Sequence, residues 1–396
     1  MDAHYLNNAA TTWPKPSCVA TAMAAFLEGR GANLARGSAS RRDLSTLDMV
    51  TTCRMEIASL FGGPDADPRN VTFTANVTES LNIVLKGFLK PGMRVATSSM
   101  EHNAVMRPLR RLESEGVSVT VMPCTAEGVL EPGTLAGALE KGLDLVVLSH
   151  ASNVCGTVQD LDRLAPLCAS AGVPLVLDTA QTAGVIPVDA KGWNLAACCF
   201  TGHKGLLGPQ GTGGILWRED FASECRPLIE GGTGSFSHEE IQPSVLPDKF
   251  EAGTPNLPGL AGLLAALDWL KETGIGPIRR KEDELGERLL TGLLEIPGIS
   301  FYGRRTMESR LPVFALNLAN LDNGRAALEL SDRWGIETRP GLHCAPTAHR
   351  TLGSFPQGAL RISPGFFNTE DEIDLCLEAV GILARENAGR RGTGLK

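Results

Sequence analysis

Residues 174–204 read PLVLDTAQTAGVIPVDAKGWNLAACCFTGHK and hold the pattern that decides the fold. Two short apolar runs, 174–178 and 196–201, are each followed by polar side chains. Runs of this length and composition are typical of strands that are buried on both faces of a sheet. In open α/β sheets, ligands bind beyond the carboxyl ends of such strands. We therefore expect Asp178 and Lys204, which follow the two runs, to lie in a functional site.

Apolar runs alternate with amphipathic stretches over residues 71–217, which favours a parallel or mixed sheet covered by helices on both faces. The expected strands are Val71–Thr74, Arg94–Thr97, Val117–Met122, Leu143–Ser149, Pro174–Asp178, Ala196–Thr201 and Gly214–Trp217. The expected helices of this region and of the segment before it include Ser17–Leu27, Asp43–Phe61, Thr78–Phe88 and Leu161–Ser170.

A long helical stretch from Pro258 to Leu294, broken near Gly274, follows this region and reads as a connector between domains. A smaller α+β unit comes after it, with expected strands Pro312–Asn317, Ile336–Thr338 and Ala359–Ile362 and expected helices Arg325–Trp334 and Asp371–Glu386. We therefore expect a large domain over residues 15–257, a connecting helix over 258–274, and a small domain made of residues 1–14 and 275–396.

The composition is that of an ordinary globular protein, with 43% hydrophobic and 21% charged residues and a net charge of -8. No run of like charges suggests a nucleic-acid groove or a membrane surface, so we expect a small-molecule partner. No apolar stretch approaches the roughly 20 residues that a bilayer requires, and no signal peptide is expected. The ten cysteines are scattered without CxxC spacing, so we expect a reducing compartment, the cytoplasm, and no metal site.

Two strand ends carry candidate chemistry. A carboxylate at the end of an apolar strand is unfavourable unless a cation meets it, so Asp178 is either a turn cap or the partner of a protonated ring nitrogen or a metal. Lys204 lies between a buried strand and the glycine-rich residues 205–214, where desolvation lowers a lysine pKa and favours Schiff-base chemistry. A solvated loop lysine is the alternative. A P-loop is not expected, because GxxxxGK[ST] is absent.

Three further segments follow strands and are ambiguous when taken alone. Residues 76–79, NVTE, open a helix, which either is simply capped there or binds a phosphate at its free N–H groups. His102 either stacks on a flat ring or caps a helix, and Asn153 is equally open. A lysine, an acid for a ring nitrogen and a helix N-terminus for a phosphate together match the needs of pyridoxal 5'-phosphate, or PLP. The combination predicts a PLP enzyme.

Motifs along nearly the whole chain resemble those of the cysteine desulfurases, within the class V aminotransferase branch of fold-type I PLP enzymes. The motifs are YLNNAATT at 5–12, NVTESLN at 76–82, EHN at 101–103, SNVCGT at 152–157, DTAQ at 178–181, TGHK at 201–204, FEAGTPN at 250–256 and RPGLHCA at 339–345. The resemblance implies a large domain with a mostly parallel seven-stranded sheet between helices, a smaller α+β domain, and a homodimer.

The resemblance also implies roles for single residues around PLP. Lys204 would bind PLP covalently, Asp178 would keep its ring nitrogen protonated, and His102 would stack on the ring. The other PLP ligands that it implies, near the 3-oxygen or the phosphate, are Asn153, Gln181, Thr78, Thr201, His203 and, for the phosphate of the neighbouring subunit, Thr254.

On the substrate side, Arg361 matches the arginine that grips the substrate carboxylate, with Arg36, Arg339 and Asn153 as further substrate ligands. Cys344 would attack the sulfur of the bound cysteine. Its setting, RxGxHCA, is the form found in the SufS-like, group II desulfurases, whereas a buried cysteine near a turn is the structural alternative. Residues 346–358 depart from the usual group II pattern, which bears on substrate access.

The function that follows is conversion of L-cysteine to L-alanine, with the sulfur left as a persulfide on Cys344 for a protein acceptor, for example in iron–sulfur cluster assembly. A selenocysteine lyase, or another class V aminotransferase or lyase acting on a small amino acid, is the enzymatic alternative. A thiol-rich sulfur-carrier or metal-handling protein is the non-enzymatic one, and the scattered cysteines disfavour it.

Overall fold

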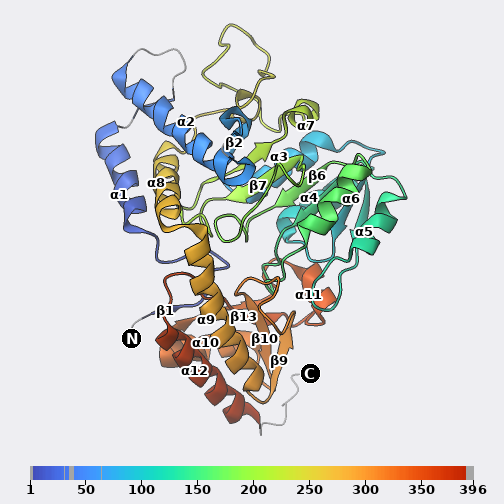
Figure 1. The fold of residues 1–396 in the computed structure, drawn as a ribbon, viewed down its shortest axis with the longest axis vertical. Helices are drawn as coiled ribbons and strands as arrows, with labels where there is room; N and C mark the ends of the chain where they lie inside the picture. Colours follow the sequence, from blue (N-terminus) through green and yellow to red (C-terminus); the bar gives the residue numbers. More distant parts are fainter. Residues whose placement is uncertain (1–2, 31, 35–39, 64, 389–396) are drawn as a thin grey trace.

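The computed structural model describes residues 3–30, 32–34, 40–63 and 65–388. They form a larger unit and a smaller one, joined by the consecutive helices α8 (Leu257–Thr273) and α9 (Ile275–Glu295) (Figure 1). In the described part of the chain, no helix is both long and apolar enough to cross a bilayer.

The larger unit is built around a seven-stranded sheet with the strand order β2-β8-β7-β6-β5-β3-β4. Its strands are β2 (Val71–Thr74), β3 (Arg94–Ser98), β4 (Ser118–Met122), β5 (Leu145–Ser149), β6 (Leu175–Asp178), β7 (Ala197–Thr201) and β8 (Gly213–Trp217). Strands β3, β4, β5, β6 and β7 run parallel, and β8 runs antiparallel to both of its neighbours. The expected fold class, a mostly parallel seven-stranded sheet between helices, is confirmed.

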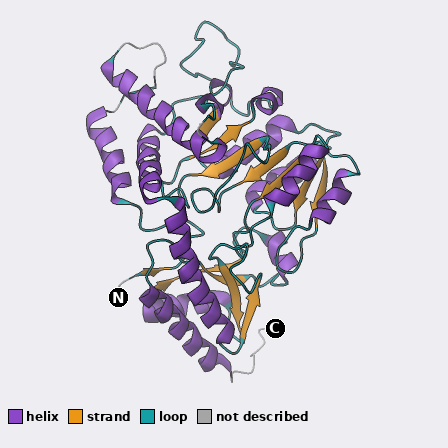
Figure 2. Ribbon diagram, viewed as in Figure 1, coloured by secondary structure: helices purple, strands orange, loops and turns teal. Residues whose placement is uncertain are grey.

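Helices cover both faces of this sheet (Figure 2). They are α1 (Ser17–Ala25), α2 (Arg41–Gly62), α3 (Val77–Phe88), α4 (Asn103–Glu113), α5 (Pro132–Leu139), α6 (Leu161–Ser170), α7 (Glu219–Glu224) and α8, with short π- or 3-10 helices at Phe26–Arg30, Pro68–Asn70 and Asp248–Phe250. Successive strand residues enter opposite cores: Leu177 and Cys198 pack in one, Val176 and Cys199 in the other. Because both faces are buried, the strands read as continuous apolar runs.

The smaller unit holds a four-stranded antiparallel sheet in the order β12-β13-β10-β9. Its strands are β9 (Ile299–Tyr302), β10 (Phe314–Leu318), β12 (Arg339–Gly341) and β13 (Ala359–Ile362), and β1 (His4–Tyr5) pairs with β11 (Ile336–Glu337) beside them. Its helices are α9, α10 (Asn323–Trp334), α11 (Pro346–Leu352) and α12 (Glu370–Ala388). Leu289 of α9 and Val380 of α12 share its core with Phe314 of β10.

The long helical stretch is two helices that meet at Gly274, whose φ of 82° lies in the left-handed region and ends α8. The break near this residue was predicted. Leu263 of α8 packs in the same core as Ile57 of α2, while Leu289 of α9 packs in the smaller unit. The division into domains at residues 258–274 therefore stays a prediction.

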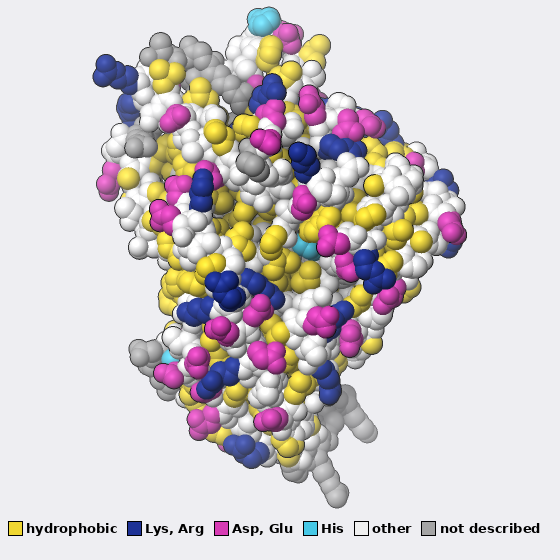
Figure 3. Space-filling view, in the orientation of Figure 1, with side chains coloured by type: hydrophobic (Ala, Val, Ile, Leu, Met, Phe, Trp, Pro, Cys, Tyr) yellow, Lys and Arg dark blue, Asp and Glu magenta, His cyan; other side chains and the backbone are white. Residues whose placement is uncertain are grey.

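Hydrophobic side chains gather across the middle of the face shown in Figure 3, where the two units meet, and charged side chains lie above and below them.

Candidate active site

The carboxyl ends of four neighbouring parallel strands meet at one edge of the large sheet. Asp178 ends β6 and Lys204 follows β7, while His102 follows β3 and Asn153 follows β5. Two backbone carbonyls of the smaller unit accept hydrogen bonds from this edge: the backbone N–H of Asn103 donates to Cys344 over 2.7 Å, and Asn153 donates from Nδ2 to His343 over 2.7 Å. The structure thus brings the smaller unit's Cys344 loop onto the predicted ligand edge.

Lys204 is the centre of this cluster. Burial lowers the pKa of its amine to about 8, and the charge of Asp178 acts against that shift, while Arg361 and Arg339 add to it. The Cys344 thiol also acts on the amine, in the direction of a higher pKa. The backbone carbonyl of Lys204 accepts a hydrogen bond from Thr12 Oγ1 over 3.0 Å, so the N-terminal arm holds this turn in place.

Asp178 is a buried carboxylate, with 5% of its surface exposed. The backbone N–H of Ala180 donates to its Oδ1 over 2.9 Å, and the Ser149 hydroxyl lies 3.5 Å from its Oδ2. Burial raises the pKa of Asp178, and the hydrogen bond from Ala180 and the charge of Lys204 oppose that rise. A cation at Oδ2 would compensate the buried charge.

His102 caps α4, since its Nδ1 accepts a hydrogen bond from the backbone N–H of Ala104 over 3.0 Å. Burial lowers its pKa to about 4, and the nearby charge of Lys204 lowers it further, so the ring is neutral at pH 7. The sequence did not distinguish between two roles of His102, capping a helix and stacking on a flat ring. The structure shows the cap, and the partly exposed neutral ring remains able to stack on a flat ligand.

Glu101, beside His102, also belongs to this site, and no functional role was predicted for it. It is fully buried, and it accepts hydrogen bonds from Ser98 Oγ over 2.5 Å and from Ser149 Oγ over 2.6 Å. Burial raises its pKa to about 7, against the effect of these hydrogen bonds. The sequence does indicate a role for Glu101, because this residue follows a strand and lies next to the candidate ligand His102.

Residues that fit a phosphate surround the start of α3. Asn76 caps this helix by accepting from the backbone N–H of Glu79 over 3.0 Å, and Thr78 lies in its first turn. Gly213 pairs with Thr201 of β7, and a Cβ on Gly213 would lie 2.8 Å from the Cα of Asn76, so glycine permits α3 to start beside the end of β7.

His203 is a second candidate ligand for a phosphate group. Its Nδ1 is buried and has no hydrogen-bond partner among the residues that the structure describes. Burial lowers the pKa of His203 to about 4, and the charge of Lys204 acts in the same direction, so the ring is neutral and one of its nitrogens is a donor. A buried ring nitrogen without a partner in the described part of the chain fits a hydrogen-bonding ligand such as a phosphate group.

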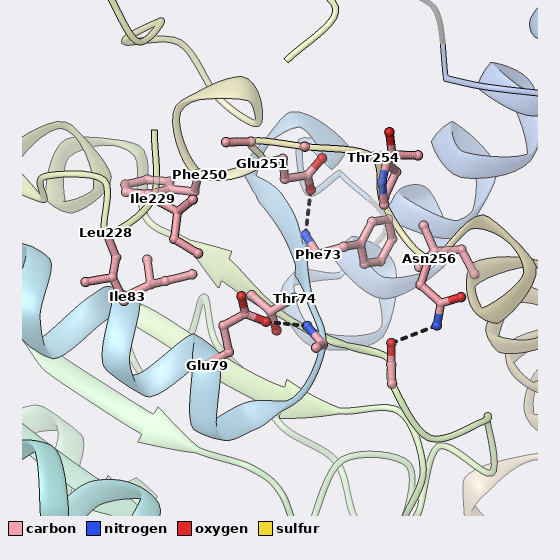
Figure 4. Close-up of a pocket in the computed structure, with 16 residues that line it drawn as sticks. Phe73, Thr74, Glu79, Ile83, Leu228, Ile229, Phe250, Glu251, Thr254 and Asn256 are labelled. Atoms are coloured by element: carbon pink, nitrogen blue, oxygen red, sulfur yellow. Dashed lines mark hydrogen bonds between the residues drawn. The ribbon is translucent and has the colours of Figure 1, made fainter. Parts of the chain in front are cut away.

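The other two predicted PLP ligands differ in position. Gln181 lines a cavity of about 50 Å³ together with Lys204, and its Nε2 donates to the carbonyl of Ala9 over 3.0 Å. Thr254 is exposed, and it borders a separate pocket of about 220 Å³ beside the start of α3 (Figure 4). None of the residues that line this pocket lines the cavity of Lys204.

The loop that carries Thr254 is tied down by a buried ion pair. Arg54 of α2 donates from Nη1 to Glu251 Oε1 over 2.7 Å and from Nη2 to Oε2 over 2.5 Å, and both side chains are largely buried. The backbone N–H of Phe73 donates to the same carboxylate over 2.6 Å (Figure 4). Residues 250–256 are thereby joined to β2 and α2.

Cys344 lies in a strained turn and is exposed. His343 and Cys344 have φ values of 49° and 55°, in the left-handed region that non-glycine residues rarely adopt. Behind the turn, His343 Nδ1 lies 3.1 Å from His349 Nε2, and His349 Nδ1 lies 2.7 Å from Ser354 Oγ. An exposed thiol in a strained, well-anchored loop is suited to act as a nucleophile.

Arg361 and Arg339 are opposite each other on β13 and β12. Arg361 is almost fully buried, donating from Nη1 to the Asn153 carbonyl and from Nη2 to Asn7 Oδ1, each over 2.9 Å. Its Nε is buried without a partner in the described part of the chain, and burial lowers its pKa to about 9, with Arg339 adding to that shift. A buried guanidinium with a spare donor fits a carboxylate ligand. Arg36, the third predicted arginine, lies outside the described residues.

A sequence profile described as aminotransferase class V matches residues 4–376. The chain belongs to the class V aminotransferase family. One relative is a probable cysteine desulfurase of Methanothermobacter thermautotrophicus, which is 32% identical to this chain over 385 residues. The alignment covers 96% of this chain and 95% of the relative. This chain is 30% identical to a cysteine desulfurase of Pectobacterium atrosepticum over 381 residues, 93% of this chain and 90% of the relative.

Solved structures agree with this placement of the class V chain. The apo cysteine desulfurase from Thermococcus onnurineus NA1 has a TM-score of 0.89 and 30% identity, over 98% of this chain and 95% of that one. The cysteine desulfurase CsdA from Escherichia coli has a TM-score of 0.86 and 28% identity, over 97% of this chain and 95% of that one. The predicted class V resemblance is confirmed, and the narrower SufS-like group stays a prediction.

Proposed function

We propose that this chain is a PLP-dependent cysteine desulfurase, which converts L-cysteine to L-alanine and holds the sulfur as a persulfide on Cys344. One observation carries the proposal: hydrogen bonds from Asn103 and to and from Asn153 hold the Cys344 loop and Arg361 at the strand ends that carry Asp178 and Lys204. One site therefore contains a lysine that can bind PLP, a carboxylate for the ring nitrogen, an arginine for the substrate carboxylate and a thiol that can attack sulfur. The relatives and structures named cysteine desulfurase support it.

The residues present fit PLP. The unsatisfied Nδ1 of His203 and the start of α3 suit its phosphate, with Thr78 and Thr201 as hydroxyl donors. When bound, PLP supplies a protonated ring that takes up the electron pair left by removal of the substrate Cα proton. We assign the ring nitrogen to Asp178 and the ring face to His102. The remaining PLP ligands in this proposal are Asn153, Gln181 and, across a dimer, Thr254.

Lys204 is suited to move protons. Because its pKa is lowered to about 8, a substantial fraction of the amine is neutral near pH 7.5, and a neutral amine is both a nucleophile and a base. It holds PLP before the substrate enters, and it then accepts the Cα proton of the substrate. The buried carboxylate of Asp178 keeps the ring nitrogen protonated through this step.

In this proposal, arginine side chains orient the substrate. Arg361 binds the substrate carboxylate with its spare donor, and Arg339, opposite it on β12, adds a second cation. Arg36 is a third substrate ligand in this proposal, and Asn153 completes the set. Asn153 also donates to the backbone of the Cys344 loop, so the substrate side and the nucleophile side are held by one residue.

Sulfur transfer then uses Cys344. Its thiolate attacks the sulfur of the bound cysteine, an S–S bond forms, and the Cβ–S bond breaks. The electron pair of the broken bond stays with Cβ, which takes a proton and becomes the methyl group of alanine. The sum is cysteine plus the Cys344 thiol giving alanine plus a Cys344 persulfide, so no outside oxidant or reductant is needed.

We further propose a homodimer and a protein acceptor for the sulfur, with iron–sulfur cluster assembly as the expected pathway. Thr254 faces outward beside a pocket that the exposed Leu228 and Ile229 also line, and exposed apolar side chains of this size are typical of contact surfaces. Exposure of Cys344 leaves its persulfide accessible to another protein.

The test is to mix PLP-loaded protein with L-cysteine and to measure alanine and reductant-released sulfide together, for the wild type, Cys344→Ala and Lys204→Ala. Equal amounts of the two products, lost in both variants, are expected. A matched control is Cys18→Ala, which removes a partly exposed thiol of the larger unit. Turnover of selenocysteine without turnover of cysteine would favour a selenocysteine lyase, and dependence on a 2-oxo acid would favour an aminotransferase.

A further inference from the structure

Glu101 is fully buried, and its hydrogen-bond donors are uncharged. Its carboxylate accepts from Ser98 Oγ, from the backbone N–H of Ser149 over 2.9 Å and from Ser149 Oγ, and within the described residues no lysine, arginine or histidine forms a salt bridge with it. Neutral donors stabilise a buried carboxylate less than a cation does, so its protonated form is accessible near neutral pH.

Ser149 stands between two carboxyl groups. Its hydroxyl lies 2.6 Å from Glu101 Oε2 and 3.5 Å from Asp178 Oδ2. The arrangement follows from the sheet, because Ser149 ends β5 and pairs in register with Asp178 at the end of β6. A serine hydroxyl has one proton, so it donates to one of the two acids at a time.

We propose that Glu101 is a positioning residue that controls the charge of Asp178 through the Ser149 hydroxyl. When Glu101 is ionised, Ser149 donates to Glu101, and Asp178 lacks that donor. When Glu101 is protonated at Oε2, it donates to Ser149 Oγ, and the Ser149 hydroxyl turns to Asp178. This inference rests on the proposed function, in which Asp178 is the partner of the PLP ring nitrogen.

Both effects of protonating Glu101 act on Asp178 in one direction. A hydrogen bond to the ionised form lowers the pKa of a carboxyl group, and removal of a neighbouring negative charge lowers it as well. Asp178 then stays an anion, and the shared proton stays on the ring nitrogen. With Glu101 ionised, Asp178 becomes more basic and competes for that proton.

The pKa of Glu101, about 7, lets both states be populated near neutral pH. Apart from Lys204, the titratable groups beside the pair do not change charge there. His102 has a pKa of about 4, and burial raises the pKa values of Cys124, Cys198 and Cys199 above the usual value. Lys204 also acts on Asp178, and its nitrogen can still gain or lose a proton after attachment to PLP. An inflection in the wild type therefore supports the relay only where Glu101→Gln removes it.

The experiment is a pH titration, from 5.5 to 8.5, of the visible absorption of PLP bound to the protein without any substrate. Glu101→Gln is the central variant, because its amide mimics the protonated acid: it can donate to Ser149 and accept from Ser98. We expect the wild-type spectrum to change with an inflection near pH 7, and Glu101→Gln to keep the low-pH spectrum throughout. Ser98→Ala is the matched control, since it removes a donor to Glu101 without touching Asp178, and it should move the inflection to higher pH.

Ser149→Ala separates a hydrogen-bond relay from a simple field effect. Adding E101Q to S149A should change the spectrum far less than E101Q does alone. If Glu101→Gln titrates like the wild type, or if its effect is as large in the S149A protein, the proposal is wrong. Should Glu101→Gln fail to fold, a smaller spectral change across the inflection in Ser149→Ala and an upward shift of the inflection in Ser98→Ala decide the matter. A wild-type protein that binds no PLP would count against the proposed function, whereas a normal spectrum without an inflection would count against the relay alone.

Discussion

Asn153 donates a hydrogen bond from Nδ2 to the backbone carbonyl of His343 over 2.7 Å, which joins the end of β5 to the loop that carries Cys344. The carbonyl of Asn153 in turn accepts from Arg361 Nη1 over 2.9 Å. One residue of the larger unit thus contacts both the loop of the nucleophile and the arginine assigned to the substrate carboxylate.

We therefore predict that Asn153→Ala slows persulfide formation on Cys344 about tenfold or more, because loss of a buried hydrogen bond of about 1–3 kcal/mol loosens the Cys344 loop. The rate can be followed in a single turnover by mass spectrometry of the protein after mixing with L-cysteine. Asn70→Ala, which changes a partly exposed asparagine of the larger unit, is the control. An unchanged rate in Asn153→Ala would mean that the loop is held by its other contacts alone.

The pair of histidines behind Cys344 makes stability depend on acid pH. The Arg339 carbonyl, 3.0 Å from His343 Nε2, can only accept, so His343 accepts at Nδ1, His349 donates from Nε2, and Ser354 donates to His349 Nδ1. Burial lowers the pKa of His343 to about 3 and of His349 to about 4. The unfolded chain therefore takes up protons near pH 6.5 that the folded chain does not.

From this we expect the contribution of the two histidines to the free energy of unfolding to fall as the pH decreases from about 6.5 to 4. His349→Gln should reduce this pH dependence and retain the contacts, because its amide can donate to His343 and accept from Ser354. His349→Ala should reduce the pH dependence and also lower the stability at pH 7.5. Urea unfolding of the three proteins at several pH values tests this, and equal pH dependence in all three would contradict it.

Glu101 has the opposite dependence. Because burial raises its pKa from 4.5 to about 7, the folded state holds a proton that the unfolded state has lost between these two values. Its contribution to stability is present below pH 4.5 and is lost as the pH rises through 7, by on the order of 3 kcal/mol. Relative to the wild type, Glu101→Gln should thus be more stable at pH 8 than at pH 5, as measured by urea unfolding. A constant difference between the two proteins would show that Glu101 stays ionised.

The buried pair of Arg54 and Glu251 should matter far more than exposed pairs. Glu251→Ala leaves the Arg54 guanidinium buried without its partner, and such a loss costs about 3–5 kcal/mol. In contrast, Glu113→Ala breaks the exposed pair of Glu113 with Arg110, for which about 0.5 kcal/mol is expected. Urea unfolding compares the two, and similar effects would contradict the assignment. Since Glu251 holds the loop of Thr254, a weaker dimer on size-exclusion chromatography is also expected of Glu251→Ala.

The strands of the large sheet could be predicted because burial on both faces selects continuous apolar runs, and the bounds of α6 agree with the prediction. Strands β9 and β12 and helix α11 were missed. β12 contains Pro340 and Gly341, which disfavour strands, and it is at the sheet edge, where their effect is tolerated. Half-buried β9 lacks a strong apolar pattern, and α11 has only seven residues.

The sequence by itself determined which residue types end each strand, because local composition sets the positions of strands and helices. Asp178 and Lys204 therefore lie at the carboxyl ends of two neighbouring strands. Only the tertiary structure decided that the Cys344 loop contacts Asn153. The contact is made by His343, which is 190 residues away from Asn153 in the sequence. The tertiary structure also decided that Glu101 is buried against Ser149. The reason is that pKa values and nucleophile position depend on burial and on packing between the two units, and neither is a property of a local segment.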